Sequence, residues 1–155
     1  MSLVEEVQRI ADSIREMFPD AVIHRFQEPE LPARNEFVVL VKQELRRMES
    51  RSQTAAERQY TIIAYGGNAE QAITAMESFG RYVMNGMGAI PTGATATAAA
   101  AAKPLQIESF TLDAVEKLES GLMKCSGTVK TQLREAVATP VHVKMKRVEL
   151  RANPN

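Results

Sequence analysis

The sequence predicts a single domain of mixed helices and strands, and three observations lead to this prediction. An amphipathic helical pattern lies at the N-terminus, a strand–turn–strand–helix unit spans residues 36–85, and the last third alternates between apolar and polar residues. The chain has 155 residues, which is enough to bury one core without disulfides or metals. We therefore expect residues 1–155 to form one domain.

The first helix is predicted from apolar residues at helical spacing: Leu3, Val4, Val7, Ile10, Ile14 and Met17. Ser2 is a suitable N-cap, and Pro19 ends the helix. The neighbouring carboxylates Glu5 and Glu6 are expected on the solvated face. A short strand over residues 22–26 and an extended, proline-containing loop over residues 27–35 should follow.

The central unit predicts a long protruding hairpin backed by a helix. An apolar run over residues 37–41 leads to a charged tip at residues 46–51, and a second strand returns over residues 58–65. After Gly66 and Gly67, the pair Asn68 and Gln71 has the spacing of a capping box. The helix that follows should bury one stripe, formed by Ile73, Met76, Phe79 and Val83.

Residues 86–104 form an insert rich in alanine, threonine and glycine, with Pro91 and Gly93 near its start. Five consecutive alanines over residues 98–102 could extend a helix, but so short a helix is marginal in water. We favour a flexible surface loop that becomes ordered only against a neighbouring chain, since long loops in compact domains are usually functional or disordered.

The last third favours strands. Residues 112–122 also fit a helix, but a turn at residues 119–121 and the clean alternation over residues 123–133 support a hairpin. That alternation places Cys125 on the apolar face. A final strand is predicted over residues 141–150, and its change of phase at Arg147 suggests a β-bulge.

The composition excludes several classes of function. Lys plus Arg and Asp plus Glu both number 19, so the positive excess that a nucleic-acid coat needs is missing. The single cysteine has no partner for an internal disulfide and fits a reducing compartment. With no signal peptide and no membrane span in the sequence, we expect a soluble protein of the cytoplasm.

We find no catalytic, cofactor-binding or metal-binding pattern. His24 and His142 lack the spacing of a metal motif, and each is expected on the wet face of a strand. The glycine pairs do not form a dinucleotide fingerprint, which needs three spaced glycines after a strand. The chain is therefore not expected to be an enzyme or to carry a cofactor.

One surface group deserves separate consideration: Arg46, Arg47, Arg51 and Arg58. Interleaved with Glu44, Glu49 and Glu57, these arginines fit a merely solvated hairpin. They also fit an intersubunit or partner contact, because arginine is favoured where planar, paired recognition matters. A nucleic-acid site is the third reading, since the interleaved acids cancel most of the positive field.

The order of elements resembles that of the tail-terminator proteins of long-tailed bacteriophages. Three stretches carry the resemblance: residues 14–20 (IREMFPD), residues 58–65 (RQYTIIAY) leading into an amphipathic helix, and residues 143–150 (VKMKRVEL) near the end. The resemblance implies an α+β fold, with a twisted, mainly antiparallel sheet and two helices packed on one side.

The resemblance also implies a function. Members of this family form a homohexameric ring that caps the tail tube, stops its polymerisation and docks to the head–tail connector, using heterologous contacts between neighbours. The implied partners are further copies of the chain, the tail-tube protein and the connector or head-completion protein, in a virion assembled in the host cytoplasm. The alternatives are a head-completion or stopper protein of the phage neck, a small regulatory or nucleic-acid-binding module, and an enzyme whose site is completed across subunits.

Overall fold

The computed structural model describes residues 2–85, 89–90 and 105–137. Along the chain it contains α1 (Leu3–Met17), β1 (Val22–Arg25), β2 (Glu36–Ser50), β3 (Gln53–Gly66), α2 (Ala69–Asn85), β4 (Ala89–Ile90), β5 (Leu105–Lys117) and β6 (Met123–Ala136). The predicted α+β fold is confirmed. The predicted strand over residues 141–150 and its bulge lie outside the described residues.

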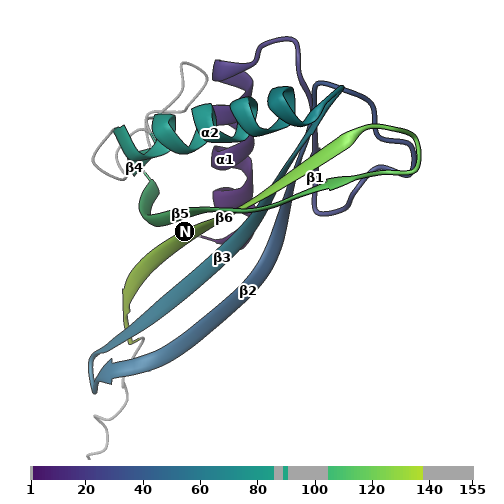
Figure 1. The fold of residues 1–155 in the computed structure, drawn as a ribbon. Coiled ribbons are helices and arrows are strands. Elements are labelled where there is room, and N and C mark those ends of the chain that lie inside the picture. Colours follow the sequence, from purple (N-terminus) through teal and green to yellow (C-terminus); the bar gives the residue numbers. More distant parts are fainter. Residues whose placement is uncertain (1, 86–88, 91–104, 138–155) are drawn as a thin grey trace, which may run out of the picture.

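The strands form one sheet in the order β1-β2-β3-β6-β5-β4. β1 runs parallel to β2, and every other neighbouring pair is antiparallel. Residues of both helices join one buried cluster with residues from a single face of the sheet, so the two helices cover the same face, as Figure 1 shows. The expectation of a mainly antiparallel sheet with helices on one side is confirmed.

Local signals fix the ends of both helices. At α1, the Ser2 hydroxyl accepts from the Glu5 N–H and the Glu5 carboxylate accepts from the Ser2 N–H, which completes a capping box. At α2, the Asn68 side chain accepts from the Gln71 N–H at 2.8 Å. The Gln71 side-chain oxygen Oε1, however, accepts from the Gly67 N–H, one residue earlier than a regular capping box requires.

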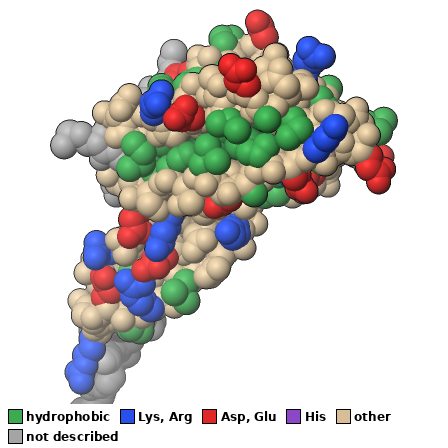
Figure 2. All heavy atoms as spheres, viewed as in Figure 1, with side chains coloured by type: hydrophobic (Ala, Val, Ile, Leu, Met, Phe, Trp, Pro, Cys, Tyr) green, Lys and Arg blue, Asp and Glu red, His purple; other side chains and the backbone are tan. Residues whose placement is uncertain are grey.

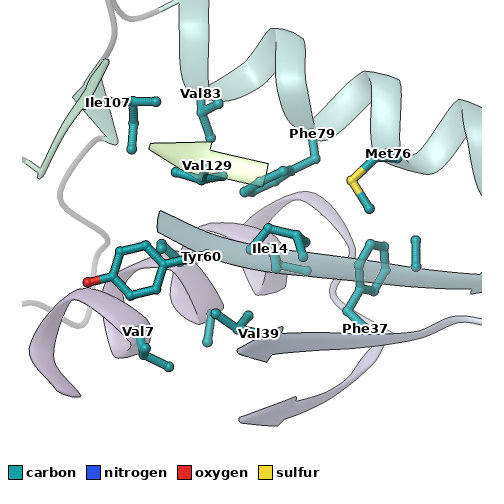
Figure 3. Close-up of a cluster of buried hydrophobic side chains, with 14 of the residues drawn as sticks. Val7, Ile14, Phe37, Val39, Tyr60, Met76, Phe79, Val83, Ile107 and Val129 are labelled. Atoms are coloured by element: carbon teal, nitrogen blue, oxygen red, sulfur yellow. The ribbon is translucent and has the colours of Figure 1, made fainter. Parts of the chain in front are cut away.

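The core lies between the helices and the sheet (Figure 3). Ile10 and Ile14 from α1 meet Phe37, Val39 and other side chains on the inner face of the strands, while α2 contributes the buried residues Ala72, Met76, Phe79, Gly80 and Val83. The expected α2 stripe is wrong at one position, because Ile73 is 37% exposed. The buried face of α2 is therefore rotated toward Ala72 and Gly80.

The described part of the C-terminal third, residues 105–137, folds as predicted, in strands. β5 and β6 pair antiparallel around a turn in which Gly121 has φ +94°, a conformation that glycine adopts without strain. Cys125, Gly127, Val129 and Thr131 are buried, as the alternation predicts. Of the insert at 86–104, the structure describes Ala89 and Ile90, which form β4 at the sheet edge. The rest of that predicted loop lies outside the described residues.

The long hairpin is part of a wider element. β3 pairs with β2 on one side and with β6 on the other, as far as Gln53 opposite Ala136. Figure 1 shows these three strands extending past the helices. We call their paired far segments the arm: residues 43–50 of β2, 53–59 of β3 and 130–136 of β6. The predicted charged tip is corrected as well, because β2 continues to Ser50 and residues 51 and 52 make the turn.

Candidate assembly surface on the arm

A buried ion cluster joins the arm to the helical layer. The Glu6 carboxylate of α1 accepts from Arg58 Nη1 at 2.8 Å, from Tyr60 Oη at 2.6 Å and from Thr131 Oγ1 at 3.0 Å. All four residues are at most 2% exposed. Buried charges are stable when they are paired and hydrogen-bonded, and here Glu6 is paired with Arg58 and accepts three hydrogen bonds.

Two predicted placements are therefore corrected. Glu6 does not lie on a solvated helix face, and Arg58 does not belong to the surface group. The sequence carried a signal for both. Glu6 stands one helical turn before Ile10 and so shares the apolar stripe, while Arg58 is in phase with Tyr60 and Ile62, which face the helices.

The cluster continues outward along the helix-facing side of the arm. Arg58 Nε donates to Glu44 at 2.7 Å, Glu44 contacts Arg46 Nε at 3.3 Å, and Arg46 Nη1 donates to Glu135 at 2.8 Å. Burial alone would lower the pKa of Arg58, but its hydrogen bonds to Glu44 and Glu6 raise it overall. The hydrogen bond from Arg58 in turn lowers the pKa of the Glu44 carboxyl. Alternating charges thus run from the core toward the tip.

The opposite side of the arm carries a second set of ion pairs. Arg47 on β2 is paired with Glu57 on β3, which also lies 3.8 Å from Lys130 Nζ on β6. Nearer the tip, Arg134 Nε donates to Glu49 at 2.8 Å. The hydrogen bond from Arg47 lowers the pKa of Glu57, and the bond to Glu49 raises that of Arg134. These pairs link all three strands across the surface.

The structure separates the four predicted interaction residues. Arg46 and Arg47 are on the arm, with side chains 48% and 44% exposed, but on opposite faces and each already paired. Arg51 is exposed in the turn and makes no ion pair with any residue that the structure describes. Arg58 is buried, so three of the four predicted arginines lie on the surface.

Sequence reasoning missed the exposed apolar side chains near these charges. Val41, Leu45 and Met48 on β2 are 39%, 47% and 63% exposed. Away from the arm, Figure 2 shows a continuous band of hydrophobic side chains across one side of the body. The large exposed apolar residues of α2 and β5 are Ile73, Met84 and Leu112. Exposed apolar patches rimmed by polar residues mark interaction sites more often than chance.

We searched the described residues for metal-ligand groups and for membrane-spanning helices. Within residues 2–85, 89–90 and 105–137, no three His, Cys, Asp or Glu side chains are grouped so as to hold a metal ion. None of the described helices is both long and apolar enough to span a membrane. His24, expected on a wet strand face, is partly exposed and lies 3.2 Å from the Glu36 carboxylate. His142 lies outside the described residues.

Comparison with known proteins gives distant similarity at the level of structure alone. No protein-family model and no curated protein matches the sequence. Among solved structures, the fold is similar to a chain in one described as "Virion of native gene transfer agent (GTA) particle", with a TM-score of 0.42 and 9% identity over 86% of this chain and 100% of that chain. A similarity at this level assigns neither a family nor a function to this chain.

Proposed function

We propose that this chain is a non-enzymatic structural subunit that assembles as a ring and acts as a tail terminator of a phage-like virion. The ring caps the tail tube, stops its polymerisation and presents a docking surface to the head connector. The carrying observation is the three-stranded arm, which is anchored in the core by Glu6 and Arg58 and extends beyond the helical layer with charges on both faces.

The arm's construction supports a contact role over a merely solvated hairpin. The buried ion cluster at the base of the arm joins β3 and β6 to α1. Held by Glu6 and two strand partners, the arm keeps a defined direction relative to the body. A defined direction is what repeated heterologous contacts around a ring require. The resemblance of the sequence to tail terminators agrees with this assignment.

The first test is the assembly state of the purified protein. Sedimentation velocity and negative-stain imaging should show a ring with a lumen. Added to growing tail tubes of the same virus, the rings should bind one tube end and narrow the distribution of tube lengths. A compact monomer or dimer at all concentrations would refute the proposal. Rings that bind the head connector but ignore tube ends would instead support the head-completion alternative.

The second test reverses charge on the arm. The double variant Arg47→Glu/Arg51→Glu should fold normally, because exposed ion pairs contribute only about 0–1 kcal/mol. It should nevertheless weaken ring formation or docking, since like charges set against an acidic partner cost several kcal/mol. The matched control is Arg15→Glu/Arg81→Glu, which reverses two exposed, ion-paired arginines on the helices. Normal assembly of both double variants would exclude Arg47 and Arg51 from the interface.

A further inference from the structure

The sheet ends in an open strand edge at β5. β4 pairs only with Leu105 and Gln106, so among the described residues the outer edge of β5 from Ile107 to Lys117 has no strand partner. Such an edge presents a row of unpaired backbone N–H and C=O groups that accepts an additional strand. Natural proteins usually protect long edges with charges or cover them, which makes the side chains of this edge informative.

The two faces of this edge differ in chemistry. On the helix-facing side, Phe110 and Leu112 pair with the inward-facing Val129 and Gly127, and Leu112 is 39% exposed. On the other side stand three acidic residues, Glu108, Asp113 and Glu116. Lys130 and Lys124 lie 3.9 Å and 3.8 Å from Glu108 and Glu116, and Thr128 donates to Asp113. An incoming strand should therefore carry apolar residues on one face and basic residues on the other.

The chain itself contains a segment with this pattern, residues 141–150. Val141, Val143 and Met145 alternate with His142, Lys144 and Lys146. In a strand, these two sets point to opposite faces. The apolar set matches the helix-facing side of the β5 edge, and the basic set matches the acidic side. Residues 141–150 thus complement the β5 edge in two ways, in the alternation of apolar and charged side chains and in the sign of the charge.

The position of the chain end favours a neighbour's edge over the chain's own. At the far end of β6, the Val137 N–H donates to the Ser52 carbonyl in the turn at the arm's tip. The β5 edge runs away from that tip, because Ile107 at its start lies opposite Thr131 and Lys117 at its end lies opposite Met123. Thr139 precedes Pro140, and a residue before proline favours an extended backbone over one that turns back. The 18 residues after Val137 reach roughly 60 Å when extended.

We propose that residues 141–150 of one copy add as a strand to the open edge of β5 in a second copy. The apolar side chains then continue the layer under α2, and the lysines face Glu108, Asp113 and Glu116. This inference rests on the proposed function in one respect, that the ring supplies the second copy. A contact of this kind is heterologous, as a closed ring requires.

The test is disulfide trapping between two full-length preparations that carry different tags. One contains Leu112→Cys, and the other contains cysteine at one position from 141 to 146. The native Cys125 is buried and stays in place, with the single variants as controls for it. A disulfide needs Cα atoms about 4.4–6.8 Å apart and Cβ atoms on the same side. Mixed-tag dimers should therefore form with cysteine at Val141, Val143 or Met145 and be lost with cysteine at His142, Lys144 or Lys146.

A third preparation carries both cysteines in one chain, and a crosslink that forms only within this chain at high dilution would overturn the inference. Mixed-tag crosslinks that do not alternate between neighbouring positions from 141 to 146 would overturn it as well. So would the absence of any crosslink in a sample that has assembled. Sedimentation of the same samples keeps the two proposals apart. Rings without phased crosslinks leave the proposed function standing and remove the strand exchange. Phased crosslinks in particles that never close into rings support the strand exchange and remove the terminator ring.

Discussion

Replacing Glu6 with alanine should strongly destabilise the fold, because one carboxylate serves three buried donors. Its removal leaves the Tyr60 and Thr131 hydroxyls, which are 0% and 1% exposed, without their acceptor. It also takes from the buried Arg58 its carboxylate partner on α1, while Glu44 stays in place. Breaking a buried ion pair typically costs about 3–5 kcal/mol. Since Arg58 keeps Glu44, we expect a loss near the lower end, about 3 kcal/mol of unfolding free energy.

Urea unfolding followed by circular dichroism measures this loss directly. For a chain of this size, about 3 kcal/mol corresponds to a fall in melting temperature of roughly 6–12 °C. The matched control is Glu77→Ala, which removes an exposed helical glutamate paired with Arg81 at 3.2 Å. That control should cost under about 0.5 kcal/mol beyond the change in helix propensity. A Glu6→Ala loss no larger than the control's would refute the buried cluster as a determinant of stability.

A double substitution distinguishes the cost of an unpaired Arg58 charge from the cost of the unsatisfied Tyr60 and Thr131 hydroxyls. In the double variant Glu6→Leu/Arg58→Met both charges leave together, so no charge of this pair stays buried alone. Replacing buried ion pairs with apolar residues of similar volume is often neutral or stabilising. We therefore expect the double variant to be more stable than Glu6→Ala. If it is equally unstable, the hydroxyls of Tyr60 and Thr131, and not the charge of Arg58, dominate the cost.

Three further outcomes follow from the same structure. Spectrophotometric titration of the folded protein should show no tyrosine ionising at the usual pKa of about 10, because burial raises the pKa of Tyr82 to about 12 and the pKa values of Tyr60 and Tyr65 further. The stability that these tyrosines contribute is full below about pH 10 and falls as the pH rises through the raised pKa values. In denaturant, all three tyrosines should titrate near the usual pKa of about 10. Gly66→Ala should lower the unfolding free energy measured in urea by about 1–3 kcal/mol, because the added Cβ would lie 2.7 Å from the backbone nitrogen of Ala72. In the control Gly67→Ala, the added Cβ meets only the flexible ends of side chains, so the unfolding free energy should stay nearly the same. Cys125 should react with a thiol reagent only on unfolding, since burial raises its pKa and closes access, and rapid reaction of the folded protein would contradict its placement.

The sequence predicted the fold well where the signals are local. Ser2 and Pro19 delimit α1, Asn68 begins α2, and the alternation around Cys125 identifies β6. Each of these depends on a few neighbouring residues, whose capping or periodicity is independent of the rest of the chain. Such signals state where an element begins and which face is buried, but they do not state which strands are neighbours.

The misplaced residues are those whose environment is set by distant parts of the chain. Glu6 and Arg58 are 52 positions apart, so their pairing cannot be read from local pattern even though each lies on a buried face. Charged residues are rarely fully buried unless they are paired, which is why the surface is the default assignment for both. The place of β6 beside β3 in the arm was missed for the same reason, because the two strands meet only through a long-range register.

The charge pattern of the arm constrains what its arginines contribute to an interface. Arg46 and Arg47 are already paired within the subunit, so any contact with a neighbour replaces an existing ion pair and gains little free energy. Charges of this kind select partner and register more than they add affinity. The affinity must then come from exposed apolar side chains, which the described residues offer at Leu45 and Met48 on the arm and at Leu112 on the β5 edge. In the proposed ring, the charges of the arm accordingly determine orientation. The exposed apolar side chains and the backbone hydrogen bonds of strand addition at β5 supply the binding free energy.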